Sequence, residues 1–393
     1  MTASIKFFPV GNGDMTLLTF DNDQTLLIDM FVRKAADDED DETPDVMSML
    51  RAELKRDDKE RLYVDAFLLS HPDDDHICGL ERHFHLGPPE DWNEDDDKII
   101  IREMLSSPIV FRRASTKHVL GADAKAWAKE ARRRVQLYRD TGWFGGEGDR
   151  IQIMGEDADG KTDDIPAIVV KADETFSAIN RRFDNAFEAR LIGPRPHGED
   201  DELEKTLAKN DSSVIVRFSI RGGGYADKCR FLTGGDAGVA IWERVWKKHG
   251  TYNADWLTYD VLLAPHHCSW RSLSYDSYSE HGEDAEVCED ARSALAQIRK
   301  GAIVVSSSKA IDPDEADPPS DRAKREYISI VDGKDSRFIC VADVWDDEVQ
   351  PLTYKIEATG IVKVVKSARV AAAAALGIGA TSAHARPHGS KRG

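Results

Sequence analysis

A mostly apolar stretch, residues 64–69, leads directly into the sequence Ser70-His71-Pro72-Asp73-Asp74-Asp75-His76. Such a stretch is typical of a strand that is buried on both faces of a sheet. Imidazole nitrogens and carboxylate oxygens are common ligands of divalent metals. We therefore expect a metal site on the loop after this strand, formed by His71, Asp73, Asp75 and His76. The alternative is an acidic surface turn, because Ser-His-Pro-Asp is also a favourable turn sequence.

Three other predicted strands end in residues of similar chemistry, namely Asp29, Asp236 and the pair His266-His267. A carboxylate at a strand end is often only a cap for the next turn or helix, so each end alone is weak evidence. Four strand ends that all offer metal ligands in one chain favour a shared site.

The apolar patterns along the chain predict two groups of strands, with helices between and after them. The expected strands are residues 5–10, 15–20, 25–28, 165–170, 213–220, 229–232, 261–264 and 302–306, followed by a strand pair at 338–344 and 352–358. The expected helices are residues 45–54, 122–139, 237–249 and 293–299. This order favours an α+β fold of the αββα type, in which two sheets pack face to face and helices cover their outer faces.

One domain, residues 1–366, is expected to hold both groups of strands. Residues 87–209 read as a long insertion, because most connections within a domain are about 4–6 residues long. We expect the insertion to fold as a lobe beside the metal site and to control what enters it. Residues 367–393 are rich in alanine and then basic, and we expect a disordered tail.

The composition restricts the function and the cell compartment. The chain has 72 acidic and 53 basic residues, a formal net charge of −19, so a basic surface for nucleic acid could only be local. The five cysteines form no CxxC pair, which argues against a disulfide framework, and we expect Cys78 and Cys268 to be unlinked. No signal peptide and no membrane-spanning stretch is evident. We expect a cytoplasmic protein without membrane contact.

The ordered set of motifs resembles the metallo-β-lactamase superfamily, and within it the branch that includes the soluble hydrolase domain of ComEC, a DNA-uptake channel protein. The matching motifs are Val10-Gly11-Asn12-Gly13-Asp14, Asp29, His71-Pro72-Asp73-Asp74-Asp75-His76-Ile77-Cys78-Gly79, Asn210-Asp211-Ser212-Ser213-Val214, residues 231–236, His266-His267-Cys268-Ser269 and residues 304–308. The resemblance therefore covers most of the chain before the tail.

The chain departs from the family pattern at several positions. Asp73 stands where most of the superfamily has a second histidine, although this branch accepts aspartate. An extra glycine lengthens the turn before Asp236, Cys268 replaces the glycine of an HHGS motif, and the lysine that often precedes this motif is absent. Other branches of the superfamily have a further motif whose histidine is the third ligand of one metal, and this chain has no clear counterpart. His118 and His197 are possible substitutes.

The resemblance implies a centre with two divalent metal ions, Zn²⁺ or Mn²⁺. The implied metal ligands are His71, Asp73, Asp75, His76, Asp236 and His266, with Asp236 bridging the two ions. Asp75 and His267 are the implied catalytic residues, the first orienting a water and the second acting at the leaving oxygen, and either histidine of the pair could be the ligand. The residues implied behind the ligands or at the substrate are Asp14, Asp29, Asn210 and Ser212.

The implied activity is metal-dependent hydrolysis, and the branch favours a phosphodiesterase or nuclease that acts on a nucleotide or nucleic acid. The insertion holds three basic groups: Arg112-Arg113, Arg132-Arg133-Arg134 and Arg181-Arg182. They could contact a phosphate-containing substrate, or they could be the solvated faces of helices. Two alternatives stay open. One is hydrolysis of an amide, ester or thioester, because a fold does not fix its chemistry. The other is a non-catalytic module that binds a protein partner through residues 87–209.

Overall fold

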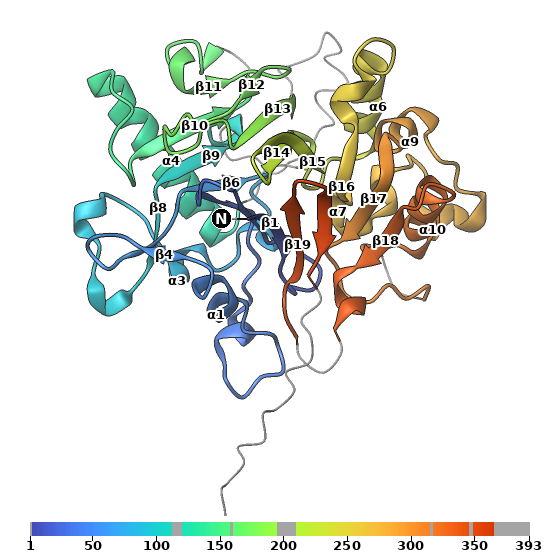
Figure 1. Cartoon of the computed structure of the whole chain (residues 1–393), viewed down its shortest axis with the longest axis horizontal. Helices are drawn as coiled ribbons and strands as arrows, with labels where there is room; N and C mark the ends of the chain where they lie inside the picture. The colour runs from blue at the N-terminus through green and yellow to red at the C-terminus, as the bar shows by residue number, and fades with distance from the viewer. Residues whose placement is uncertain are drawn as a thin grey trace, which may run out of the picture. The chain divides into compact units, whose positions relative to one another are not determined.

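Two large mixed β-sheets form the centre of the computed structural model, which describes residues 2–111, 120–157, 160–194, 210–314, 317–345 and 349–364 (Figure 1). The chain divides into two units, Met1–Lys363 and Val364–Gly393, and both sheets belong to the first. The expected disordered tail, the histidines His118 and His197, and the pair Arg112-Arg113 lie outside the described residues.

The first sheet has nine strands in the order β11-β10-β9-β6-β3-β2-β1-β19-β20. Their bounds are β1 (Ala3–Phe7), β2 (Thr16–Thr19), β3 (Thr25–Ile28), β6 (Ala66–Leu69), β9 (Glu103–Ser106), β10 (Arg150–Met154), β11 (Val169–Val170), β19 (Leu352–Glu357) and β20 (Gly360–Lys363). β3, β6, β9 and β10 pair in parallel, whereas β1 pairs antiparallel with β2 and with β19. The first and last parts of the unit therefore meet inside one sheet.

The second sheet has seven strands in the order β12 to β18 along the chain. Their bounds are β12 (Thr175–Phe176), β13 (Phe187–Gly193), β14 (Ile215–Gly222), β15 (Tyr225–Thr233), β16 (Tyr259–Leu263), β17 (Ile298–Ser306) and β18 (Arg337–Cys340). The strands β12 to β15 are antiparallel, and β15 to β18 are parallel. A smaller sheet joins β4 (Lys55–Arg56), β5 (Leu62–Val64), β8 (Ile99–Ile101) and β7 (Phe84–His85).

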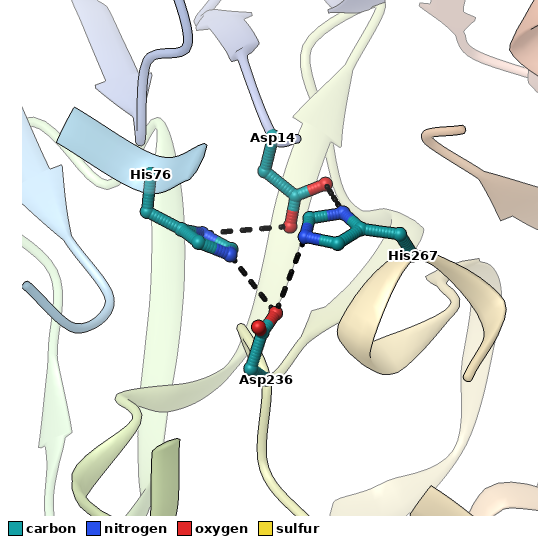
Figure 2. A group of neighbouring side chains, drawn as sticks. All are labelled: Asp14, His76, Asp236 and His267. Carbon is teal, nitrogen blue, oxygen red and sulfur yellow. Dashed lines mark ion pairs between the residues drawn. The ribbon is translucent and has the colours of Figure 1, made fainter. Parts of the chain in front are cut away.

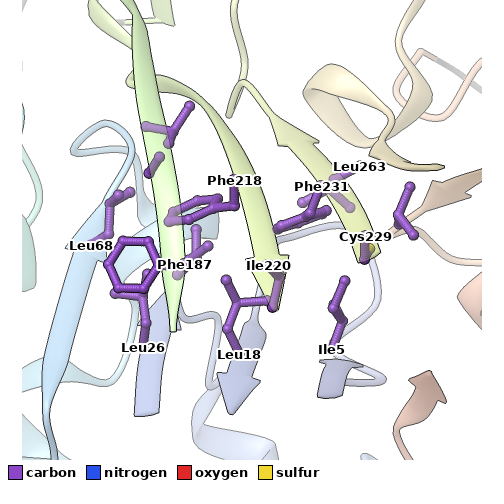
Figure 3. Packing of buried hydrophobic residues seen from close by; sticks show 14 of the residues in the cluster. Ile5, Leu18, Leu26, Leu68, Phe187, Phe218, Ile220, Cys229, Phe231 and Leu263 are labelled. Carbon is purple, nitrogen blue, oxygen red and sulfur yellow. The ribbon is translucent and has the colours of Figure 1, made fainter. Parts of the chain in front are cut away.

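The two large sheets pack against each other through one apolar core. Leu18, Leu26 and Leu68 of the first sheet share this core with Phe218 and Phe231 of the second (Figure 3). Their strand neighbours Leu17, Leu27 and Phe67 belong to a different cluster. This alternation follows from the two-residue period of a strand, which sends successive side chains to opposite faces.

Helices cover the outer face of each sheet. The cluster on the first sheet includes residues of α1 (Val46–Arg51), α3 (Leu80–His83) and α4 (Ala122–Thr141). The cluster on the second includes residues of α6 (Val239–His249), α9 (Glu289–Leu295) and α10 (Asp321–Val331). The prediction of two face-to-face sheets with outer helices agrees with this architecture.

The prediction that residues 87–209 form a separate lobe is wrong for the described part of that segment. β9 and β10 lie inside the first sheet, and β13 extends the second sheet beside β14. Trp127 of α4 is fully buried against Phe67, with their ring centroids 5.0 Å apart. The segment therefore builds both layers of the core.

Other predicted elements also differ from the structure. The strand expected at 165–170 is a 3₁₀ turn, Pro166–Ile168, followed by the two-residue strand β11. Residues 64–69 form two strands of different sheets, because the buried Asp65 carboxylate between them accepts hydrogen bonds from the Thr25 amide and from Arg102. The helix expected at 293–299 ends at Leu295, and β17 begins at Ile298. The strands expected as a pair at 338–344 and 352–358 lie in different sheets.

Candidate metal centre

The predicted loops converge where strands of both sheets end. β3 leads to Asp29, β6 to Ser70, and β15 and β16 to the loops that carry Asp236 and His267. Two backbone hydrogen bonds join these loops: Val214 N donates to Ser70 O at 3.0 Å, and His266 N donates to Gly235 O at 3.0 Å. Ligands that are far apart in sequence are therefore held at one place.

Four buried side chains form the centre of the site: Asp14, His76, Asp236 and His267 (Figure 2). Each offers one nitrogen or oxygen, and these atoms all lie within 4.8 Å of one another. All four side chains are at most 2% exposed. Two acids and two histidines in this arrangement could bind a metal ion.

The two oxygens of the Asp236 carboxylate face different partners. Oδ1 lies 2.9 Å from His76 Nε2 and 3.6 Å from His267 Nε2. Oδ2 lies 3.6 Å from His71 Nε2 and 3.4 Å from His266 Nε2. The carboxylate thus stands between two groups of imidazoles.

Two further aspartates complete these groups. Asp73 Oδ2 lies 3.6 Å from His71 Nε2, and Asp75 Oδ2 lies 3.4 Å from His267 Nε2. All of the side chains that were predicted as metal ligands from the sequence are therefore brought together.

The donor atoms fit a divalent cation. His71 Nε2, His76 Nε2, Asp236 Oδ1 and both ring nitrogens of His267 are buried without a well-formed hydrogen bond. Leaving such a group unsatisfied costs about 1–3 kcal/mol. Two atoms bound tetrahedrally to one Zn²⁺ at about 2.0–2.2 Å lie about 3.4 Å apart. The nitrogen–oxygen separations of 3.4 and 3.6 Å match this spacing better than that of a hydrogen bond.

A carboxylate or a hydroxyl lies near the Nδ1 atom of each of the histidines His71, His76 and His267. Asp29 Oδ2 is 2.8 Å from His76 Nδ1, and Asp14 Oδ1 is 3.4 Å from His267 Nδ1. Ser70 Oγ donates to Asp29 at 2.6 Å and lies 3.1 Å from His71 Nδ1. Such contacts at Nδ1 turn the Nε2 atom toward a metal and fix the ring orientation.

The carboxylates set the protonation of this centre. Burial alone would lower the pKa of His76, but Asp236 and Asp29 raise that pKa well above its usual value. Burial likewise opposes protonation of His267, and Asp236 and Asp14 raise its pKa to about 10. Burial would raise the pKa of Asp75, and His267 and His76 lower it to about 2. Without a metal, both imidazoles would therefore hold protons at neutral pH.

Close backbone contacts explain the glycines of the two turns. A Cβ atom at Gly13 would lie 2.8 Å from Asp75 O and would also overlap the Phe31 ring. Gly235 has a φ of +48°, and a Cβ there would lie 2.6 Å from Ser70 Oγ. At Gly234, the other glycine of this turn, a Cβ would lie 2.6 Å from the Trp242 ring, so a side chain is excluded there too.

The histidine pair lies in a strained segment. His266, His267 and Cys268 all have positive φ values, of 53°, 53° and 68°. Left-handed backbone costs a non-glycine residue about 1–2 kcal/mol, and such strain clusters at functional sites. Cys268 thus keeps the backbone conformation that a glycine of an HHGS motif would adopt freely. All five cysteines are free thiols, including Cys78 and Cys268, as predicted.

The solvent exposure of His266 and His267 does not favour the roles predicted for them. His267, expected to be catalytic, has a fully buried side chain whose nitrogens both face carboxylates, whereas His266 is 16% exposed. Asp73 and Asp75 are the other accessible members, at 18% and 35%. Asp73, Asp75 and His266 therefore form the exposed side of the centre.

The remaining predicted residues lie beside the centre. Asn210 and Ser212 lie in a 3₁₀ turn, where the Ser212 carbonyl accepts a hydrogen bond from Ser107. The next residue, Ser213, faces Gly235 and was not predicted. Ser70 was also missed as a functional residue, although its position between two strand-end acids and histidines could have indicated it.

The chain matches no known protein-family model, and no curated protein matches it. Within the described part of the chain, no helix is both long and apolar enough to cross a membrane.

Proposed function

We propose that this chain is a metal-dependent hydrolase of the metallo-β-lactamase superfamily, with two divalent ions bridged by Asp236. The observation that carries the proposal is the position of the Asp236 carboxylate, whose two oxygens face two separate sets of ligands. Carboxylates in this role are typical of two-metal hydrolases.

The two sets would each hold one ion. The first consists of His71, Asp73 and His266 around Asp236 Oδ2. The second consists of Asp75, His76 and His267 around Asp236 Oδ1. His267, predicted to be catalytic, would instead be the additional histidine ligand, so that both histidines of the pair would bind metal.

The fold supports the assignment to the superfamily. The motifs follow the order expected of the family, and each lies at a strand end of one of two packed sheets. The Asp29 carboxylate lies behind His76, as the resemblance implies for a strand-end aspartate.

Bound divalent metal would supply Lewis acidity toward water and toward a substrate oxygen. The protein's own residues would position the reactants. Asp75 is the most exposed acid of the set, and its ionised carboxylate can accept a hydrogen bond from water. Burial lowers the pKa of His266, so its ring is neutral at pH 7 and its Nε2 lone pair is available to bind a metal. Asp14 and Asp29 would hold His267 and His76 in place during turnover.

We propose a phosphodiester as the substrate. Divalent ions held by these two sets would supply Lewis acidity to both the attacking and the leaving oxygen of a phosphodiester. The net charge of −19 and the acidic opening of the site disfavour a long duplex. A nucleotide, a cyclic dinucleotide or a short single strand fits these constraints better.

A hydrolysis screen with Zn²⁺- or Mn²⁺-loaded protein tests this function. It should compare bis-p-nitrophenyl phosphate, single-stranded DNA, RNA and cyclic dinucleotides with an ester, a thioester and a β-lactam. We expect turnover of at least one phosphodiester that Asp75→Ala abolishes. Asp74→Ala is the matched control, because Asp74 belongs to the same loop but faces Gly121 rather than the centre.

Turnover of only the ester, thioester or β-lactam would contradict the phosphodiesterase assignment while keeping the hydrolase. Metal-loaded protein that hydrolyses none of these substrates would contradict the enzymatic proposal and favour an interaction module. Equal activity of Asp75→Ala and Asp74→Ala would remove Asp75 from the mechanism.

A further inference from the structure

A cavity of about 780 Å³ lies between the first half of α4 and residues 81–98. None of the residues that line it belongs to the metal centre. Sites for small molecules are typically about 300–1,000 Å³ in volume, so this cavity is large enough to bind one.

Part of the cavity surface is apolar and lies on the buried core. Phe84, Leu86, Pro88 and Ala126 line it. Phe84 is 1% exposed, and its ring centroid lies 5.4 Å from that of Phe67, a residue of the strand β6. An apolar group of a ligand would therefore lie on a surface that the main core supports.

Two lysines on α4 give the cavity a positive edge. Lys125 and Lys129 are four residues apart on the helix, so they lie on the same face. Among the residues that the structure describes, neither ammonium group has a hydrogen bond or an ion pair. Arg133, one turn further along, is by contrast paired with Glu130 and Asp149.

This pair of unpartnered lysines is notable in a chain with 72 acidic residues. Like charges four residues apart destabilise a helix by about 0.2–0.5 kcal/mol. An anion between the two ammonium groups would remove that repulsion. The acids Glu81, Asp91 and Asp96 belong to other elements around the cavity and could accept hydrogen bonds from hydroxyl or amino groups of a ligand.

We propose that this cavity binds a small amphipathic anion. The apolar body of the ligand lies against Phe84 and Ala126, and its phosphate, sulfonate or carboxylate group lies between Lys125 and Lys129. The proposal is independent of the function proposed for the metal centre, because the two sites share no residue.

Fluorescence titration with anilinonaphthalene sulfonate tests the proposal, because this probe combines an aromatic body with one anionic group. Phenylnaphthylamine, which lacks the sulfonate, is the matched neutral probe. We expect one sulfonate probe to bind per chain. The double variant Lys125→Glu/Lys129→Glu should weaken its binding by about tenfold or more, which corresponds to about 1.4 kcal/mol, and should leave the neutral probe unchanged.

Ala126→Trp should abolish the binding of both probes, because an indole would fill the apolar part of the cavity. Lys300→Glu is the control for charge reversal, because Lys300 is an 82% exposed residue of β17. Circular dichroism and thermal unfolding establish that each variant is folded.

Three results would overturn the proposal: no binding of the sulfonate probe to the folded wild type, binding that survives both the lysine reversal and Ala126→Trp, or equal weakening by Lys300→Glu. If the lysine reversal alone is without effect and Ala126→Trp blocks both probes, the cavity is an apolar site and the anionic part of the proposal is wrong.

Discussion

Asp29 has two features at once: a carboxylate that contacts the metal centre and a left-handed backbone conformation. Its carboxylate accepts hydrogen bonds from Ser70 N and Oγ and lies against His76 Nδ1, and its own φ is 54°. Asparagine tolerates this left-handed conformation almost as well as aspartate. The change Asp29→Asn therefore removes the charge behind His76 while it preserves the turn.

We predict that Asp29→Asn weakens Zn²⁺ binding by about 10–100-fold, the usual effect of losing a partner behind a metal-bound histidine. Competition with a chromophoric chelator measures this change. Asp74→Asn in the same loop should bind Zn²⁺ as the wild type does. Wild-type affinity in Asp29→Asn would show that Asp29 only shapes the turn.

The raised pKa values of His76 and His267 predict a pH dependence of metal binding. A raised pKa means that each ring keeps its proton up to a higher pH, so a metal must displace protons at neutral pH. Zn²⁺ affinity should therefore keep rising above pH 7, by about tenfold per pH unit for each displaced proton, toward the His267 pKa of about 10.

Calorimetry of Zn²⁺ binding in buffers of different ionisation enthalpy measures these protons directly. We expect at least one proton to be released per chain at pH 7.5. An affinity that levels off near pH 7, with no proton release above that pH, would mean that both histidines have ordinary pKa values.

At the residue level, the sequence predicted which side chains lie together better than how deeply each would be buried. The dense motif from His71 to His76 could hardly be overlooked, because four ligand groups lie within six residues. The roles of His266 and His267 could not be assigned, because they depend on which ring is buried. That burial follows from three successive left-handed residues, which no local pattern indicates when the third is Cys268.

At the level of elements, α4 shows how a basic sequence can be structural. Arg132, Arg133 and Arg134 were candidates for contact with a phosphate-containing substrate. Arg134 is only 2% exposed and donates to Glu130 and to the carbonyl of Ile101, so a substrate cannot reach it. Charge reversal at Arg134 would thus test the stability of the fold and not the binding of a substrate.

We predict that Glu130→Gln lowers the free energy of unfolding by about 3 kcal/mol at pH 7, because each unit of pKa shift corresponds to about 1.36 kcal/mol. Burial would raise the Glu130 pKa, but Arg133 and Arg134 lower it to about 2. A lowered pKa stabilises the fold above the ordinary value of 4.5, and this stabilisation is lost as the pH falls toward 2.

Denaturant unfolding at several pH values tests this prediction. The difference between wild type and Glu130→Gln should narrow below pH 4.5. Asp164→Asn is the control. The Asp164 side chain is 57% exposed, so its ion pair with Arg139 should contribute little to the free energy of unfolding. Equal effects of the two changes would contradict the buried role of Glu130.

Most helices and strands could be predicted from the sequence, but which elements lie next to each other in the fold could not. The strands expected at 213–220 and 229–232 are present, as the antiparallel pair β14 and β15. The break at Asp65 was missed because a buried, hydrogen-bonded acid resembles a chance polar residue in a strand. The region 87–209 looked like an insertion because its short strands carry little periodicity of their own.

At the scale of the whole molecule, the pairing of β1 with β19 joins the two ends of the folded unit. Leu352, Tyr354 and Ile356 of β19 are buried in the central core. Pairing between segments so distant in sequence depends on the assembled sheet, so the strands at 338–344 and 352–358 were wrongly expected to pair with each other.

We predict that a chain ending at Lys363 folds and binds metal as the full chain does, because residues Met1–Lys363 form one unit. A chain ending at Gln350 should fail to fold, because it lacks β19 and exposes the β1 edge. Circular dichroism and thermal unfolding compare the two. Cooperative unfolding of the shorter chain at the full-length temperature would show that β19 is dispensable.

If Asp236 bridges two metal ions, the purified protein should contain both of them. Inductively coupled plasma mass spectrometry after metal-replete expression should find about two transition-metal ions per chain in the wild type and in the control Asp74→Asn. Asp236→Asn should retain the fold and lose both ions. A wild type without metal, or an Asp236→Asn variant that keeps two ions with wild-type affinity, would show that Asp236 does not bridge two ions.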